Sequence, residues 1–469
     1  MRHPVLSCDH APQFGSNRRR RLVPVASLML MLAVAGCTSS DDLSDTLASL
    51  NPMGDNKKKL PGERKSILAA DGQTQIVTKG KTVVVPPARS GVPWSQASGP
   101  IGNNPGNVAL SGTAGNRIWA TAAAEVGAAG FGTESVRVFS RPVEADGRIF
   151  VYDPNGNVAA HSAENGGRIW RVNLKPEGVS AVTPGGGVAV EGGKVFVSTG
   201  YGVVAALDAS SGAVLWSKKL DHPGRGAPTA ADGKLFLVSQ GNLLYALNAG
   251  DGSEIWTFKG VPESGGLLGS ANPAVANGFV IVPFSSGELV AVDIKSGNGA
   301  WTQQMARGSR NYAITGLTDI TASPVVDDGV VYASGVGNRT AAFQLKTGAQ
   351  LWEVPVGSAY TPAVAGNAVF VVDLDDNLMA IDRKTGEVIW TSKLPVTRAK
   401  HRATHWAGPV LAGGSLWLAS NEGGLLAIDP TSGRVVVTRD GNDVTVSSPA
   451  VMQGRLVTLS ANGTLAAFD

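Results

Sequence analysis

The sequence ALDASSGAVLW, residues 206–216, decides the fold because its pattern returns along most of the chain. Asp208 is followed four residues later by Gly212, and Trp216 follows that glycine after four more. The same glycine-to-tryptophan spacing occurs at Gly115–Trp119, Gly166–Trp170, Gly252–Trp256, Gly297–Trp301, Gly348–Trp352 and Gly386–Trp390, and an eighth copy places Val437 after Gly433. Neighbouring copies lie 38 to 51 residues apart. The chain therefore contains an array of structural repeats.

A second signature precedes each tryptophan signature and predicts hairpins. A proline opens a short apolar run, which is followed by a glycine-centred turn and another apolar run, as in residues 142–150 and 324–332. Asp-Gly and Asn-Gly favour tight hairpins because they tolerate positive φ. The side chain of the Asp in the first signature is expected to form hydrogen bonds with the backbone of its own turn. Each repeat thus predicts four short antiparallel strands, which is one blade of a β-propeller.

The two halves of an incomplete repeat predict how the ring closes. Residues 465–469 (LAAFD) match the first half of the signature, whereas Gly115 to Trp119 form the second half alone. A strand near Trp119 is therefore expected to complete the last blade, which removes two exposed sheet edges. We predict an all-β, eight-bladed β-propeller over residues 111–469, closed by an N-terminal strand that joins the C-terminal blade. The tryptophans are expected to fill the seams between blades.

The N-terminal region has the features of an export signal with a lipid site. Arg18 to Arg21 precede an apolar stretch over residues 22–35, which is too short to span a bilayer but is typical of a signal peptide. Residues 34–37 (VAGC) resemble a bacterial lipobox. We therefore expect a lipoprotein signal peptide over 1–36 and lipid attachment at Cys37. Residues 37–110 are expected to form a flexible tether and N-terminal extension.

Composition excludes several classes of function. The net charge is +3, but residues 1–36 contribute +4, so the remainder carries about −1 and is not expected to bind nucleic acid. Only two cysteines are present, Cys8 and Cys37, which excludes a disulfide framework and a thiolate zinc site. His401 and His405 have helical i,i+4 spacing but no carboxylate cluster beside them, and they are interpreted as loop residues. No metal site and no catalytic residue is predicted.

The paired signatures resemble the tryptophan-docking repeats of quinoprotein alcohol dehydrogenases and of a non-enzymatic branch with the same repeats. With the lipobox and the tether, the chain resembles the BamB family of outer-membrane assembly lipoproteins. Thr38, rather than Asp, follows the lipid site. By this resemblance, the protein is anchored at the periplasmic face of the outer membrane. It is expected to need no cofactor.

The resemblance also implies a partner-binding surface. Propeller loops of this family contact a POTRA domain of BamA, the barrel-inserting protein, and the corresponding residues here are Leu267, Leu268, Asp319, Ile320 and Thr321. Unfolded outer-membrane proteins are possible substrates, bound by strand addition at the blade rims. The alternatives are a PQQ-dependent dehydrogenase-like quinoprotein and a propeller lipoprotein with another periplasmic partner. Repeats of this kind specify fold strongly and function weakly.

Overall fold

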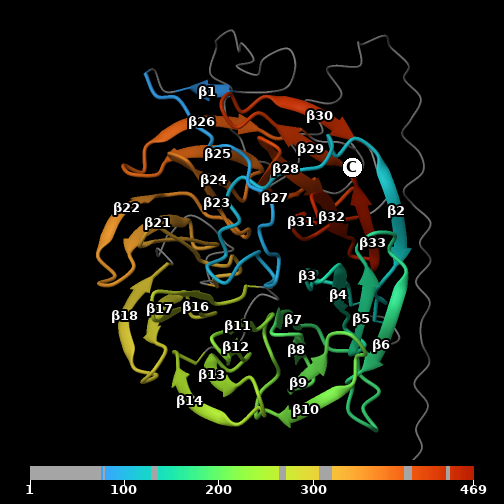
Figure 1. The fold of residues 1–469 in the computed structure, drawn as a ribbon. Helices are drawn as coiled ribbons and strands as arrows, with labels where there is room; N and C mark the ends of the chain where they lie inside the picture. The colour runs from blue at the N-terminus through green and yellow to red at the C-terminus, as the bar shows by residue number, and fades with distance from the viewer. Residues whose placement is uncertain are drawn as a thin grey trace, which may run out of the picture. The chain divides into compact units, whose positions relative to one another are not determined.

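Every regular element in the computed structural model is a β-strand, within the residues that it describes: 75–77, 80–127, 136–262, 271–305, 319–395, 404–439 and 444–469. The strands form eight antiparallel sheets arranged as a ring, which Figure 1 shows. Each sheet is one blade, and its innermost strand is also the shortest in most blades. The predicted eight-bladed, all-β propeller is confirmed.

The first four blades follow the chain in order. Their strands are β3 (Val143–Ala145), β4 (Arg148–Tyr152), β5 (Asn157–Ser162) and β6 (Arg168–Asn173) in blade 1; β7 (Gly186–Glu191), β8 (Lys194–Thr199), β9 (Val203–Asp208) and β10 (Val214–Lys219) in blade 2; β11 (Thr229–Ala231), β12 (Lys234–Val238), β13 (Leu243–Asn248) and β14 (Glu254–Lys259) in blade 3; and β15 (Ala274–Ala276), β16 (Phe279–Pro283), β17 (Glu288–Asp293) and β18 (Gly299–Gln304) in blade 4.

The last four blades include two strands from the N-terminal part of the chain. Their strands are β19 (Val325–Asp327), β20 (Val330–Gly335), β21 (Arg339–Gln344) and β22 (Gln350–Val354) in blade 5; β23 (Ala363–Ala365), β24 (Ala368–Val372), β25 (Asn377–Asp382), β26 (Val388–Lys393) and β1 (Gln75–Val77) in blade 6; β27 (Trp406–Ala412), β28 (Ser415–Ser420), β29 (Leu425–Ile428) and β30 (Val435–Arg439) in blade 7; and β31 (Ala450–Met452), β32 (Arg455–Leu459), β33 (Thr464–Phe468) and β2 (Arg117–Ala122) in blade 8.

The ring closes as the sequence predicts. Strand β2 pairs with β33, with Arg117 opposite Phe468 and Ala122 opposite Thr464. Two backbone bonds between Asn116 and Asp469, of 2.9 and 3.0 Å, extend this pairing. Blade 8 is therefore assembled from both ends of the repeat array, and the closure prediction is confirmed.

The predicted turn chemistry is also present. Asp146 and Gly147 both have positive φ, of 51° and 71°, as a tight hairpin requires. Asp208 accepts bonds from the amides of Ser210 (3.0 Å) and Ser211 (2.9 Å). The hydroxyls of those two serines, followed by the Ser211 amide, lower the pKa of Asp208 to about 2. A structural role therefore accounts for this aspartate.

The tryptophans fill the seams between blades, as expected. In six seams the indole N–H donates to a backbone carbonyl in the next blade, for example from Trp216 to Ala249 over 3.2 Å and from Trp301 to Leu345 over 2.8 Å. Each of these rings also lies against the signature glycine of the next blade. A Cβ at Gly212, for instance, would lie 2.7 Å from the ring of Trp170.

This close approach predicts a large difference between two glycines that have nearly the same backbone. Gly212 and Gly147 have φ of +75° and +71°, but a Cβ at Gly147 has nothing within 4 Å. Gly147→Ala should lower the free energy of unfolding by roughly 1–2 kcal/mol through backbone strain alone. Gly212→Ala should lower it by roughly 2–4 kcal/mol, because overpacking against Trp170 is added. Urea denaturation followed by tryptophan fluorescence measures both, and equal losses would contradict this account of the seam.

Candidate functional site

The N-terminal extension reaches the middle of the ring. We call residues 94–103 the axial segment, and Figure 1 shows this part of the chain running between the innermost strands. It accepts backbone hydrogen bonds of 2.8 to 3.0 Å from five successive blades: from Glu144 to Trp94, Val190 to Ser95, Ala230 to the Gln96 side chain, Val275 to Ile101, and Val326 to Gly102. These bonds satisfy backbone amides at the inner ends of five blades.

A buried polar network fixes the axial segment further. The Asn272 side chain donates to Asn103 Oδ1 over 2.8 Å and accepts from Ser98 Oγ over 2.9 Å. Ser323 Oγ donates to the same Asn272 oxygen over 2.9 Å. All four side chains are buried, and satisfied buried networks of this kind hold their members in one arrangement. The axial segment thus ties the start of blade 4 to the start of blade 5.

The structure places Asp319, Ile320 and Thr321 inside the protein. Asp319 is 1% exposed and forms an ion pair with Arg225, which lies before β11 at the start of blade 3. Arg225 also donates to the carbonyls of Ile320 (3.0 Å) and Pro283 (3.1 Å). Ile320 is fully buried, and Thr321 donates to the Ala359 carbonyl over 3.1 Å.

These contacts give the three residues a positioning role. Arg225 connects the start of blade 3 to Pro283 of blade 4 and to the chain that leads into blade 5, so it fixes the position of Asp319 and Ile320. The side chains of Asp319 and Ile320 are turned inward in this conformation. The other three predicted positions, Leu267, Leu268 and the lipid site Cys37, lie outside the described residues. Binding of a partner at this surface stays a prediction.

A repeated apolar residue marks the outer rims, and the sequence reasoning did not single it out. The residue before the signature tryptophan, or before Val437, falls where the register of the outermost strand shifts, so it forms a β-bulge. In six blades this residue is apolar and 41% to 56% exposed: Ile118, Ile169, Leu215, Ile255, Leu351 and Val436. The tryptophan spacing could have identified it.

Blade 6 differs at this position, and a fifth strand lies along its rim. Strand β1 pairs antiparallel with β26, with Val77 opposite Trp390. Ile389, the bulge residue of this blade, is only 1% exposed and belongs to an apolar cluster with Val83. Asn367 fixes the chain after β1 through bonds to Val84 (2.7 Å) and Thr82 (2.9 Å). The outer edge of a blade in this ring can therefore accept an added strand.

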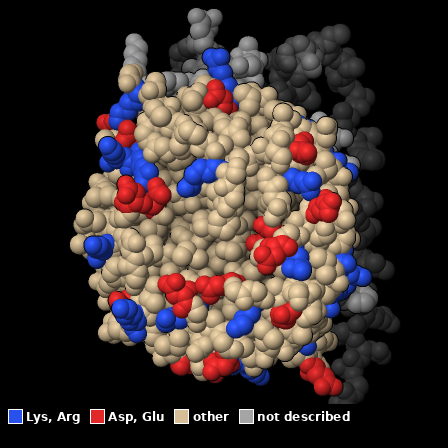
Figure 2. All heavy atoms as spheres, in the orientation of Figure 1, with Lys and Arg blue, Asp and Glu red and all other residues tan. Residues whose placement is uncertain are grey.

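Other features bear on metal binding, membrane spanning and charge. In the part of the chain that the structure describes, no group of three or more His, Cys, Asp or Glu side chains could hold a metal ion. His405 contacts Asp376 through Nδ1 over 3.0 Å, while His401 lies outside the described residues. Among the described elements, no helix is long and apolar enough to span a bilayer. On the face drawn in Figure 2, basic and acidic side chains are interspersed around a largely uncharged central hollow.

Eight antiparallel blades, seven with four strands and one with five, are joined by a tryptophan in most seams and define the chain as a β-propeller of the tryptophan-docking class. Within this class, the family model described as outer membrane protein assembly factor BamB matches residues 104–184, 154–392 and 395–469. The chain belongs to this family. The predicted resemblance is confirmed.

Curated relatives agree with this assignment, and solved structures share the fold. The BamB of Yersinia pestis is 29% identical over 280 residues, which cover 59% of this chain and 70% of that protein. The chain spans about two thirds of the length of the curated relatives that it matches. The crystal structure of BamB from Moraxella catarrhalis covers 72% of this chain and 96% of its own, with a TM-score of 0.59 and 20% identity. The quinohemoprotein alcohol dehydrogenase of Comamonas testosteroni covers 80% of each chain, with a TM-score of 0.61 and 15% identity, which shows a shared fold.

Proposed function

We propose that this chain is a non-catalytic scaffold for outer-membrane protein assembly, which receives extended polypeptide strands at its outer rims and docks on a BamA-like partner. The observation that carries the first part is the pairing of β1 with β26, on a rim whose bulge residue, Ile389, is buried. The corresponding apolar residue is exposed on six other rims. Each of these rims presents an exposed apolar side chain beside the edge of an outermost strand.

Physical chemistry indicates which ligand suits such a rim. An edge strand offers backbone N–H and C=O groups to an incoming strand, and alternate side chains of that strand supply specificity. Strands of outer-membrane barrels alternate apolar and polar residues. An unfolded strand of this kind could therefore place one apolar side chain against a residue such as Ile255 while its backbone extends the blade.

Site-specific crosslinking tests the proposal within a single chain. A photo-crosslinking amino acid at Ile255 should capture an added outer-membrane protein strand, whereas the same residue at Ile389 should not, because β1 occupies that edge. We expect a difference of roughly fivefold or more, since a few backbone hydrogen bonds of about 1 kcal/mol each are at stake. Deleting residues 75–85, which contain β1 and Val83, should raise capture at position 389. Equal capture at the two positions in the intact chain would exclude strand addition at the rims.

The proposed partner is the POTRA region of a BamA-like protein, bound through loops that include Leu267 and Leu268. In this proposal Asp319, Ile320 and Thr321 contribute by holding the base of the neighbouring loop, since Asp319 and Ile320 are buried. Lipid attachment at Cys37 would place the ring at the periplasmic face of the outer membrane. The naming of the relatives as assembly factors supports membership of such a complex. A propeller lipoprotein with another periplasmic partner is the alternative.

The described cavity at the ring centre gives no support to a quinoprotein function. Residues of the axial segment line the described cavity at the ring centre, which has a volume of about 40 Å³. By the criterion that a water needs at least about 10–15 Å³, this volume holds roughly three waters. A quinone with three fused rings does not fit in this cavity. We therefore derive no redox chemistry from the dehydrogenase-like fold.

A further inference from the structure

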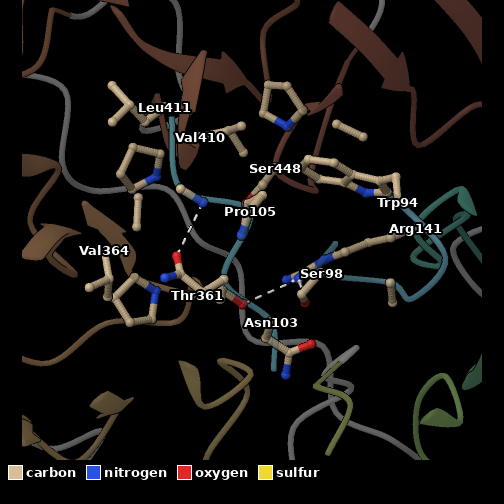
Figure 3. A pocket seen from close by; sticks show the side chains of 18 residues that line it. Trp94, Ser98, Asn103, Pro105, Arg141, Thr361, Val364, Val410, Leu411 and Ser448 are labelled. Atoms are coloured by element: carbon tan, nitrogen blue, oxygen red, sulfur yellow. Dashed lines mark hydrogen bonds between the residues drawn. The ribbon is translucent and has the colours of Figure 1, made fainter. Parts of the chain in front are cut away.

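The cavity at the ring centre, which we call the axial cavity, has an unusual lining. The axial segment, the starts of blades 6, 7 and 8, and Arg141 at the start of blade 1 surround it, as Figure 3 shows. The lining contains prolines, small apolar residues and polar side chains, and among its 18 residues there is no Asp or Glu. The cavity therefore contains a cationic group without an acidic one.

Three hydrogen-bond donors on this lining lack a protein partner. They are the indole Nε1 of Trp94, the Nε of Arg141 and the hydroxyl of Ser448, and all three atoms are buried. Trp94 and Arg141 are 3% and 6% exposed. Indole and guanidinium nitrogens only donate, so they require an acceptor. A buried donor without an acceptor costs about 1–3 kcal/mol, which makes three in one cavity a strong indication that something accepts from them.

Arg141 also differs from the other deeply buried arginines of the described residues. Arg225 pairs with Asp319, and Arg339 lies 2.8 Å from a carboxylate oxygen of Glu353. Arg141 instead donates to two neutral hydroxyls, Ser98 Oγ at 2.7 Å and Thr361 Oγ1 at 3.2 Å. Burial lowers the pKa of its guanidinium to about 10. Buried charges are ordinarily paired, so the cavity has the charge balance of an anion site.

The repeat pattern shows that this arginine is particular to one blade. The residue before the blade-opening proline is Asn272, Ser323, Thr361 or Ser448 in four other repeats, all of them neutral and polar. In blade 1 it is Arg141. The fold itself therefore does not require a cation at this position.

We propose that the axial cavity binds a small carboxylate anion, of the size of formate or acetate. A carboxylate has two oxygens with about four lone-pair sites, enough to accept from all three orphaned donors, and it neutralises Arg141. A volume equivalent to about three waters suits an anion of three or four heavy atoms. Because the ligand would contact both Trp94 of the axial segment and the blades, it would fasten the segment within the ring.

Acetate and its neutral isostere acetamide provide the test. The purified full-length protein is titrated with sodium acetate or acetamide at constant ionic strength set by sodium chloride, and binding is followed by calorimetry and by saturation-transfer NMR. Acetate is expected to bind and to raise the thermal midpoint, and acetamide is expected to bind at least about tenfold more weakly. Equal responses to the two probes, or no detectable binding of acetate at 50 mM, would overturn the proposal and leave the cavity to water.

Three variants identify the site. Arg141→Gln should weaken acetate binding by roughly tenfold or more, and Ser448→Ala and Trp94→Phe, which each delete one donor, by roughly three- to tenfold. If Arg141→Gln does not fold, the other two variants decide, since they preserve the charge. Thr183→Val is the control, because it also removes one hydroxyl but Thr183 does not line this cavity. Affinities unchanged in Ser448→Ala and Trp94→Phe would refute the assignment.

Discussion

Replacing Asp319 by alanine should lower the free energy of unfolding by about 3–5 kcal/mol, the usual cost of removing one partner from a buried ion pair. The carboxylate is 1% exposed, and its loss leaves the Arg225 guanidinium buried among carbonyl groups. The backbone carbonyl of Asp319 accepts a hydrogen bond from Val336 over 3.3 Å. Once the ion pair no longer fixes residue 319, this bond and the start of blade 5 should loosen. Urea denaturation monitored by tryptophan fluorescence measures the effect.

A double variant distinguishes an uncompensated charge from lost packing. Arg225→Met combined with Asp319→Leu removes both charges and keeps apolar volume in the site. Replacing a buried pair by apolar side chains is often neutral, so this variant should recover at least about 2 kcal/mol of the loss. If the double variant is less stable than Asp319→Ala, the energetic account of the pair is wrong.

The Asp319→Ala variant also tests the proposed docking surface, through co-purification of a BamA-like partner. Asp319→Ala should weaken capture indirectly, by loosening the base of the loop. Leu268→Asp should weaken capture without changing the unfolding curve, because we place Leu268 in the contact itself. Full capture by both variants would exclude these loops as the docking surface.

The fold could be predicted from the repeat because the residues that define each repeat lie close together in the sequence. Asp208, Gly212 and Trp216 lie within one hairpin, and each has a conformational or packing requirement that few other residues meet. Eight copies at similar spacing therefore reveal strands, turns and ring closure together. The added strand on the rim of blade 6 could not be predicted, because it comes from residues 75–77, far from β26 in the sequence.

The site was harder to predict because its contacts are distant in sequence. Asp319 has the sequence context of an exposed loop, but its burial depends on Arg225, 94 residues away. The axial segment has no periodic pattern, since it bonds to the ring mainly through backbone groups. Residues 82–87 (TVVVPP) contain three valines but form no regular strand, and Pro86 and Pro87 lack the amide hydrogens that a strand needs. Where strand pairing depends on partners that are distant in the sequence, local strand propensity does not predict it.

A disulfide across the closing pair of strands should stabilise the ring more than the same bond within one hairpin. Ala120 and Ala466 are opposite one another in β2 and β33, and antiparallel partners lie about 4.5–5.5 Å apart, within the range that a disulfide spans. The bond encloses almost the whole ring, so the chain-entropy model gives about 6 kcal/mol. The matched control joins Ser217 to Ala205, which occupy the equivalent positions of blade 2 but enclose a single hairpin, for about 3 kcal/mol.

Both pairs are introduced as cysteines into a chain in which Cys8 and Cys37 are serine, so that no other thiol competes. The closing pair should oxidise spontaneously, migrate faster on a non-reducing gel and raise the urea midpoint, and reduction should reverse all three changes. The decisive comparison is between the two disulfides, because both replace equivalent residues and introduce similar local strain. If the closing pair stays reduced while the hairpin pair forms, β2 is not held against β33 in solution. Stabilisation by the closing bond that does not exceed that of the hairpin bond would mean that ring closure contributes little to the cooperativity of the propeller.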